Sequence, residues 1–405
     1  MELFRNTPLK VHNFKFFLLG HFFSVVGRWI HNIALNWLVY DLTKSSFYLG
    51  FLNFLNSSPV IFLSLLSGFL IDKFDRRKLM IFNMFFSIWP PLFLGILTQI
   101  GIIKFKYIAV LTLLLGCFLA LDIPLRQVYI SEIVPFQYLT KAISFQSLSF
   151  NIARIIGPLI AGLIILYGNL YYCFYINSFG FFLFFFFLLI FTKSEKKYKE
   201  KKKFENLLKS YKEIFYYIKE HPYLFDTLIA ICVFTFFGAS ILVLLPVIVD
   251  KNYGGGAQEF SFLSSAIGFG AILGALRVIG KKEIKNKLEH LWKANLILFI
   301  GLLGLINPFS WKITIIFCIL IGFSFTNFIP IANSFLQENT PDFLRGRIMS
   351  LFSISFLGVH PIGNFIVGSL AEKIDINITI LIYVTILLVL NTFLLKRNFF
   401  RKNIY

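Results

Sequence analysis

The sequence is dominated by apolar runs of about 20 residues, which short polar segments separate. A run of roughly 20 apolar residues can cross the hydrocarbon core of a bilayer as one helix. Of the 405 residues, 57% are hydrophobic and only 15% are charged, and the mean hydropathy is +0.76. Soluble domains carry about 25% charged residues, so a soluble enzyme, a disordered chain and a DNA-binding domain are disfavoured. The pattern predicts an all-α, polytopic membrane protein.

Twelve spans account for the apolar runs, six on each side of a polar segment. We place the first six at 16–40, 47–71, 79–102, 107–130, 142–167 and 171–191. We place the second six at 224–249, 262–279, 291–306, 313–335, 348–370 and 376–395. The spans leave room for short loops and for no separate soluble domain.

The polar segment between the two sets is rich in lysine and has one apolar stripe. We expect it to be a cytoplasmic linker that lies along the membrane surface, where its lysines meet anionic lipid. The predicted domains are an N-terminal six-helix bundle over 1–192, the basic linker over 193–221 and a C-terminal six-helix bundle over 222–405.

An internal repeat supports this division. When the chain is shifted by 206 residues, the segment 132–162 aligns with 338–368 without a gap, and ten of the 31 positions are identical. The identities are mostly Gly, Pro, Ser and Glu, which the bias toward Phe, Ile and Leu does not favour. Two halves in the same orientation are typical of a transporter built from parallel repeats, with its path at their interface.

Lysine and arginine are distributed unevenly between alternate loops. The formal net charge is +19, and most of the basic residues outside the spans fall on one side. The opposite side carries Lys44, Lys104, Lys106, Lys251, Lys312 and Lys373. Because basic residues near span ends stay on the cytoplasmic side, we expect both termini in the cytoplasm.

Motifs for enzyme or cofactor chemistry are absent from the sequence. The four cysteines fall inside expected spans without C-x-x-C spacing, and no P-loop, H-E-x-x-H or G-x-S-x-G pattern occurs. We therefore expect no metal site, no cofactor and no enzymatic activity.

The loop between the second and third spans carries the most informative motif, GFLIDKFDRRK over residues 68–78. It resembles the G-x-x-x-D-(R/K)-x-x-R-(R/K) loop of the major facilitator superfamily. The resemblance implies twelve helices in two six-helix bundles that work by alternating access. Gly68 would let two helices approach closely, as small residues do in lipid. The second half lacks the aspartate, so the resemblance implies one such loop.

By this resemblance the loop forms a conformational latch on the cytoplasmic side. Asp72 would meet the start of the eleventh helix near 346–348, where the helix dipole favours an anion. Arg76 would pair with Asp122 near the cytoplasmic end of the fourth span. A plain basic loop with one aspartate at a helix end is the alternative. The expected latch residues are Gly68, Asp72, Arg76, Arg77, Asp122 and Arg347.

Further motifs in both halves are similar to a branch of the same superfamily that exports drugs and siderophores. They are D-x-P-x-R-Q at 122–127, N-x-A-R-x-x-G-P at 151–158 and Q-E-x-x-P at 337–341. The resemblance covers nearly the whole chain and implies efflux, with antiport against protons. One position departs from the branch, because His21 stands where glutamine is common.

Polar residues inside the spans are the candidates for substrate binding, since a charge in mid-bilayer is costly. Arg28, His31 and Asn32 share one broad face of the first span. Arg28 indicates attraction for an anionic or oxygen-rich substrate, and His31 is either a protonation switch or a partner for a neighbouring helix.

The fifth and eleventh spans, which are partners in the repeat, offer four more candidates. Asn151 and Arg154 lie in the fifth span, and His360 and Asn364 lie in the eleventh. Arg154 either binds polar cargo in the cavity or extends toward the membrane surface. No carboxylate lies clearly in mid-membrane, so proton coupling has no obvious carrier except Asp122.

These observations predict a secondary active exporter of an amphipathic small molecule, such as a drug or a siderophore-like compound. We expect a monomer in the cytoplasmic (inner) membrane that contacts its substrate, the lipid bilayer and protons, and no nucleic acid. The alternatives are an importer of a nutrient or metal chelate with the same fold, and a lipid flippase. An enzyme is disfavoured because the candidate side chains are scattered singly among the spans.

Overall fold

The computed structural model describes residues 7–192, 216–279, 286–306 and 310–402. Every regular element in these residues is helical and none is a strand. Ten helical segments are long and apolar enough to cross a membrane, which confirms the all-α, multi-span class. The other two expected spans correspond to α1 (His12–Thr43), whose polar residues lower its hydropathy, and to α12 (Lys287–Leu303), which has 17 residues.

The chain divides into two compact units. Unit 1 consists of residues 1–44, 55–198 and 255–265, and unit 2 consists of residues 45–54, 199–254 and 266–405. Each unit thus includes one short segment from the other half of the sequence. Most of the expected linker, residues 193–215, lies outside the described residues.

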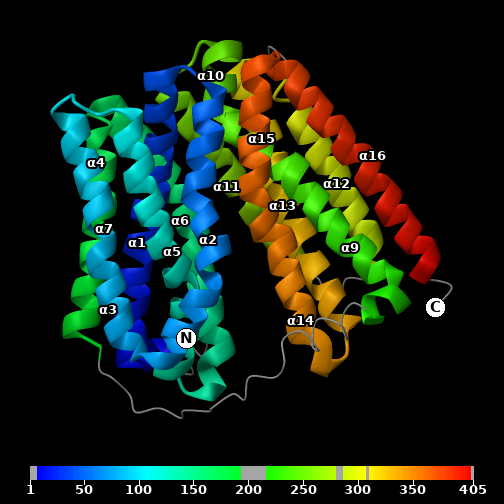
Figure 1. Ribbon diagram of the computed structural model, residues 1–405, viewed down its shortest axis with the longest axis horizontal. Helices are drawn as coiled ribbons and strands as arrows, with labels where there is room; N and C mark the ends of the chain where they lie inside the picture. Colours follow the sequence, from blue (N-terminus) through cyan, green and yellow to red (C-terminus); the bar gives the residue numbers. More distant parts are fainter. Residues whose placement is uncertain (1–6, 193–215, 280–285, 307–309, 403–405) are drawn as a thin grey trace. The chain divides into compact units, whose positions relative to one another are not determined.

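The helices of unit 1 follow one another along the first half of the chain (Figure 1). They are α1, α2 (Ser46–Lys73), α3 (Arg76–Ser87), α4 (Trp89–Gln99), α5 (Phe105–Ile133), α6 (Leu139–Tyr167) and α7 (Tyr171–Ile190). Local chemistry sets the bounds of α3, because the Asp75 side chain accepts a hydrogen bond from the backbone N–H of Lys78 at 2.9 Å and so caps the helix. Pro90 and Pro91 lie in the first turn of α4 and separate it from α3, since proline has no N–H for a helix interior.

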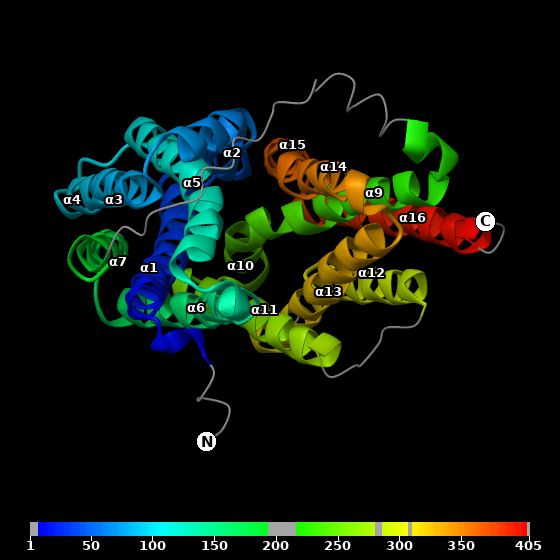
Figure 2. The same cartoon turned by 90° about the horizontal axis from the view of Figure 1, so that it is seen from below.

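Helix α1 packs against α5, α6 and α7 of unit 1 (Figure 2). The contact with α7 is close at two glycines. A Cβ atom on Gly27 would lie 2.9 Å from the Cα atom of Asn177, and one on Gly180 would lie 2.7 Å from the backbone oxygen of Phe23. Because small residues let helix backbones approach in lipid, α1 is held in a fixed rotation, and its polar side chains meet fixed neighbours.

Unit 2 is built from helices of the second half, of which the first and fifth are interrupted. Its elements are α9 (Pro222–Val233), η4 (Phe234–Gly238), η5 (Ala239–Leu244), α10 (Leu245–Tyr253), α11 (Ala257–Ile279), α12, α13 (Trp311–Glu338), α14 (Asp342–Ser353), η6 (Ile354–Gly358), α15 (Val359–Lys373) and α16 (Ile376–Lys402). Both η4 and η6 are π-helical turns, which are rare and turn the following side chains to a new face. Helix α16 lies beside α9 and α12 (Figure 1).

Positions that the sequence repeat matches make equivalent contacts in the two units. Gly157 of α6 and Gly363 of α15 are separated by the repeat offset of 206 residues. A Cβ atom on Gly157 would collide with the side chain of Trp29 in α1, and one on Gly363 would collide with the hydroxyl of Ser240 in η5. In each unit, therefore, the fifth span packs on the first through a glycine.

The start of α2 belongs to unit 2 because it is bound to α15. The hydroxyl of Ser45 donates to Glu372 Oε2 at 2.9 Å, and the backbone N–H of Ser46 donates to the same oxygen at 2.8 Å. A Cβ atom on Gly50 would lie 2.5 Å from the backbone oxygen of Asn364. A carboxylate at the N-terminus of a helix and a close backbone contact together hold this end of α2.

Candidate functional site

A cluster of charged side chains lies buried between α1 and α5 inside unit 1. Its centre is Asp122, which is 1% exposed and sits between the guanidinium groups of Arg28 and Arg126. Buried charges are costly unless they are paired. One carboxylate faces two arginines, so the cluster has an excess positive charge.

Arg126 is held by several partners. Its Nε donates to Asp122 Oδ1 at 2.7 Å, and its Nη1 lies 2.6 Å from His21 Nδ1 and 3.0 Å from the hydroxyl of Ser24. The guanidinium carbon also lies 4.7 Å from the ring centre of Phe184. A guanidinium can only donate, so Nδ1 of His21 accepts and the imidazole is neutral. Arg126 therefore acts as a fixed part of the site.

Arg28 is bound less completely. Its Nη2 donates to Asp122 Oδ2 at 3.2 Å, and its side chain is 17% exposed. Its Nε is buried and has no hydrogen-bond partner among the described residues. Buried donors are normally satisfied, and each exception calls for an explanation. Arg28 thus has donor capacity left for a ligand.

The repeat shows that unit 2 needs no such cluster. At the offset of 206 residues, Arg28 matches Phe234 and Asp122 matches Phe328. These two rings stack with their centres 4.0 Å apart and their planes 7° apart. The same contact between the first and fourth spans is therefore apolar in one unit and ionic in the other. The fold does not require the charges, which points to a functional role for them.

The expected pair of Arg76 with Asp122 is wrong. Arg76 instead forms an ion pair with Glu132 at the end of α5. The reason is helix length, because Glu132 lies ten residues after Asp122, and at 1.5 Å per residue this separates them by about 15 Å along α5. Arg76 begins α3 and reaches only the last turn of α5. In unit 2 the repeat partner of Glu132, Glu338, pairs with Lys287 at the start of α12.

The other expected latch residues have different surroundings. Arg77 donates from Nη2 to the backbone oxygen of Leu188 at 2.9 Å and from Nε to the hydroxyl of Thr192 at 3.1 Å, so it caps the end of α7. The close helix contact expected at Gly68 is not found, since a Cβ atom there would meet no atom within 4 Å in the described part of the chain. The described helices place Asp72 in the last turn of α2 and a half-buried Arg347 in α14. The side chain of Asp72 lies outside what the structure describes.

The polar face expected on α1 is divided between two neighbours. Ser24 and Arg28 face α5, whereas His31 is 1% exposed and packs edge-on against Phe174 of α7, with ring centres 5.1 Å apart. Neither ring nitrogen of His31 has a hydrogen-bond partner in the described residues. Asn32 is half-buried on the same helix. His31 therefore contributes to packing and lies apart from the charge cluster.

The candidates on the fifth and eleventh spans do not join the cluster. On α6 the amide of Asn151 donates to the backbone oxygen of Ser147 at 2.9 Å, and Arg154 is half-buried with no ion pair among the described residues. On α15 the amide nitrogen of Asn364 lies 3.4 Å from His360 Nδ1. Arg154 is thus a third cation in the spans of unit 1, in addition to Arg28 and Arg126.

Sequence reasoning missed two parts of the site. Arg126 lies in the span expected at 107–130 and was not among the expected site residues, although its spacing of four residues from Asp122 is that of a helical ion pair. Glu132 was aligned with Glu338 in the internal repeat and was not among the expected latch residues. In the residues that the structure describes, no three His, Cys, Asp or Glu side chains come together as a metal-binding group.

Solved structures share this arrangement of helices. The nucleoside transporter NupG is 14% identical, with 97% of this chain and 99% of that chain covered and a TM-score of 0.75. A bacterial homologue of the iron transporter ferroportin, in an inward-facing state, is 15% identical, with 97% and 100% covered and a TM-score of 0.73. The fold is that of a major facilitator transporter, and the chain is a multi-pass membrane protein of this class.

The family follows from the sequence comparison. The transmembrane secretion effector family matches residues 5–402, and the chain belongs to it. The staphyloferrin A transporter of Staphylococcus aureus is 26% identical over 364 residues, which are 89% of this chain and 90% of that protein. The enterobactin exporter EntS of Shigella flexneri is 24% identical over 374 residues, which are 89% and 86% of the two chains. The family and these relatives are transporters, which confirms that the chain is not an enzyme.

Proposed function

We propose that this transporter exports an anionic, oxygen-rich small molecule of the siderophore type across the cytoplasmic membrane by alternating access. In this proposal the substrate binds to Arg28 in unit 1. On binding, the anionic groups of the substrate lose hydrogen bonds to water and accept hydrogen bonds from the unused N–H donors of the guanidinium.

The observation that carries the proposal is the excess positive charge around Asp122. The buried Arg126 and the half-buried Arg28 share this one carboxylate. Arg126 has further contacts with His21, Ser24 and Phe184, whereas Arg28 keeps a buried Nε without a partner among the described residues. An anionic group is the ligand that such a site favours, because a guanidinium binds carboxylates and similar oxygens through paired N–H donors.

The relatives support the direction and the type of cargo. One is named for export of enterobactin and another for transport of staphyloferrin A. The family description also names secretion. Export is therefore favoured over import, and a polyoxygenated molecule is favoured over a lipid.

The membrane topology belongs to the same proposal. Lysine and arginine near span ends mark the cytoplasmic side, so both termini and the lysine-rich segment are placed there. We propose that the transporter acts as a monomer, because a single chain contains both halves that alternating access needs. We also propose that protons are the coupling ion.

The test is transport into everted membrane vesicles with the wild-type chain and with Arg28→Met. A charge-assisted hydrogen bond contributes about 1.5–3 kcal/mol, which corresponds to roughly tenfold to a hundredfold in affinity. We expect Arg28→Met to raise the half-saturating concentration of a catecholate or carboxylate siderophore by that factor. Arg28→Lys should retain part of the affinity, because it keeps the charge and loses the planar fork.

Two controls make the result specific. Lys104→Met removes a positive charge from an exposed position of unit 1 and should leave transport unchanged. A neutral amphipathic dye should lose little affinity in Arg28→Met. Wild-type affinity for the siderophore in Arg28→Met would contradict the site, and uptake by right-side-out vesicles in place of everted ones would contradict export.

A further inference from the structure

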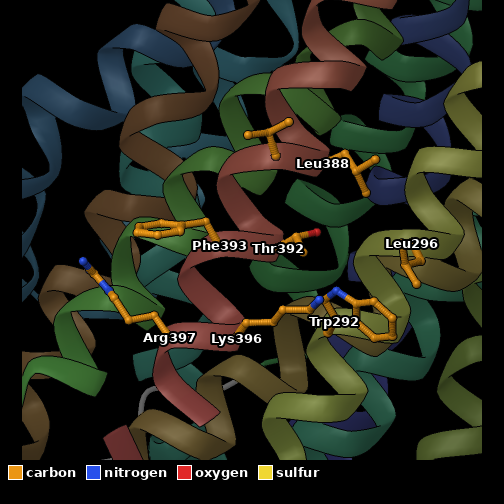
Figure 3. Close-up of a pocket in the computed structure, with 8 residues that line it drawn as sticks. Trp292, Leu296, Leu388, Thr392, Phe393, Lys396 and Arg397 are labelled. Carbon is orange, nitrogen blue, oxygen red and sulfur yellow. The ribbon is translucent and has the colours of Figure 1, made fainter. Parts of the chain in front are cut away.

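A groove between α12 and α16 of unit 2 is separate from the charge cluster. Its volume is about 730 Å³, within the range of sites that hold small molecules. Trp292 and Leu296 line it from α12, and Leu388, Thr392 and Lys396 line it from α16 (Figure 3). We call this feature the α12–α16 groove. Apart from a few polar tips, its walls are hydrocarbon, which fits an acyl chain.

The face that carries the groove is apolar and exposed. Among the large side chains that line it, Val389 is 59% exposed and Phe393 is 60% exposed. In a membrane protein such a face is in contact with lipid, where apolar exposure has no cost. The groove therefore opens onto the hydrocarbon of the bilayer.

Cationic side chains lie at one end of the groove. The Lys396 ammonium lies 5.9 Å from the ring centre of Trp292 and extends across the groove toward it (Figure 3). The neighbouring Arg397 is already bound, since its Nε donates to Asp226 Oδ2 at 2.9 Å. No ion pair of Lys396 is found within the described part of the chain. Lys396 is thus the cation that is available to an anionic group.

Two buried polar atoms of the groove lack partners. Trp292 Nε1 and Thr392 Oγ1 are shielded from solvent and make no hydrogen bond with described residues. The indole N–H can only donate, whereas the hydroxyl can donate or accept. Buried groups of this kind are normally satisfied. Both atoms lie in the walls of the groove, close to the end that Lys396 occupies (Figure 3).

We propose that the α12–α16 groove binds one anionic phospholipid. Its acyl chain lies along Leu296 and Leu388, its phosphate contacts Lys396, and its ester oxygens accept from Trp292 Nε1 and Thr392 Oγ1. Charge complementarity selects an anionic headgroup over a zwitterionic one, as in other basic pockets between transmembrane helices. The site is independent of the exported substrate.

The test is lipid binding to the purified full chain in a neutral detergent, measured by native mass spectrometry. The probes are dioleoylphosphatidylglycerol, dioleoylphosphatidylcholine and inorganic phosphate. We expect one phosphatidylglycerol per chain at concentrations where phosphatidylcholine and phosphate do not bind. Lys396→Gln should weaken phosphatidylglycerol about fivefold, the factor for one basic residue near an anionic surface, and should leave phosphatidylcholine unchanged. Trp292→Phe, which keeps a ring and removes the N–H, should weaken both lipids.

The matched control is Lys293→Gln. This lysine is exposed on the same helix, pairs with Glu289 and does not line the groove, so its removal should leave phosphatidylglycerol binding unchanged. Equal losses in Lys293→Gln and Lys396→Gln would overturn the proposal in favour of a general surface charge effect. The proposal would also be overturned if the two lipids bound equally or if phosphate alone displaced phosphatidylglycerol. It would likewise be overturned if the spectra showed dimers of the chain without bound lipid. Lys396 is exposed, so its replacement does not endanger folding.

Discussion

Replacing Asp122 by asparagine should destabilise the protein far more than replacing Arg28. Asp122→Asn keeps the size of the side chain and removes the negative charge that the guanidinium groups of Arg28 and Arg126 share. Both arginines would then remain inside unit 1 without a counter-charge. Arg28→Met, in contrast, leaves one carboxylate paired with the guanidinium of Arg126.

The contacts set the size of the effect. At an effective dielectric constant of about 20, charges 3.2 Å and 2.7 Å apart attract by about 5 and about 6 kcal/mol before desolvation is subtracted. Breaking a buried pair by removing one partner costs about 3–5 kcal/mol, and the loss in Asp122→Asn belongs in this range. Arg28→Met should change the free energy of unfolding by less than about 1 kcal/mol, because Asp122 stays compensated.

The assay is thermal unfolding of the purified chain in detergent. At about 2–4 °C per kcal/mol for a unit of this size, Asp122→Asn should lower the melting temperature by at least about 6 °C. Arg28→Met should melt within about 4 °C of the wild type. The double variant leaves one unpaired arginine in place of two and should lie between the wild type and Asp122→Asn. A wild-type melting temperature in Asp122→Asn would refute this account of the cluster.

Two further predictions concern other parts of the chain. In Gly322→Ala the new Cβ would collide with the backbone oxygen of Ile267, which cannot rotate away, so we expect a loss of about 1–3 kcal/mol in the same melting assay. Gly68→Ala is the control, since its Cβ would meet no described atom within 4 Å, and a loss as large as that of Gly322→Ala would contradict the packing argument. Asp72→Asn should abolish vesicle transport and leave expression and membrane insertion largely intact. Normal transport by this variant would contradict the latch inferred from the loop motif.

The fold was predictable because hydrophobic length is a strong signal. Apolar runs of about 20 residues mark spans whatever their detailed sequence. The interruptions were not predictable in the same way. The π-helical turns at Phe234–Gly238 and Ile354–Gly358 contain no proline, so neither turn carries the usual mark of a helix break.

The sequence allowed some residues of the site to be predicted, but not which of them form ion pairs with each other. Arg28 and Asp122 stood out because charges inside spans are rare. Their pairing depended on how far along α5 each carboxylate lies, and a loop motif carries no information about that distance. Arg76 was therefore assigned to Asp122, although Glu132 lies closer to the start of α3. His31 looked polar by type, yet its environment is the aromatic ring of Phe174.

The stacked rings of Phe234 and Phe328 have a consequence for how such proteins diversify. An aromatic pair and an ion pair occupy equivalent positions in the two halves of this fold. Substrate preference can therefore change through a few side chains, while the helix bundle stays the same. Chimeric transporters could exploit this freedom by exchanging only the lining of the first and fourth spans. After such a duplication only one half needs charged residues for substrate binding, and the other half can keep apolar residues at the same positions.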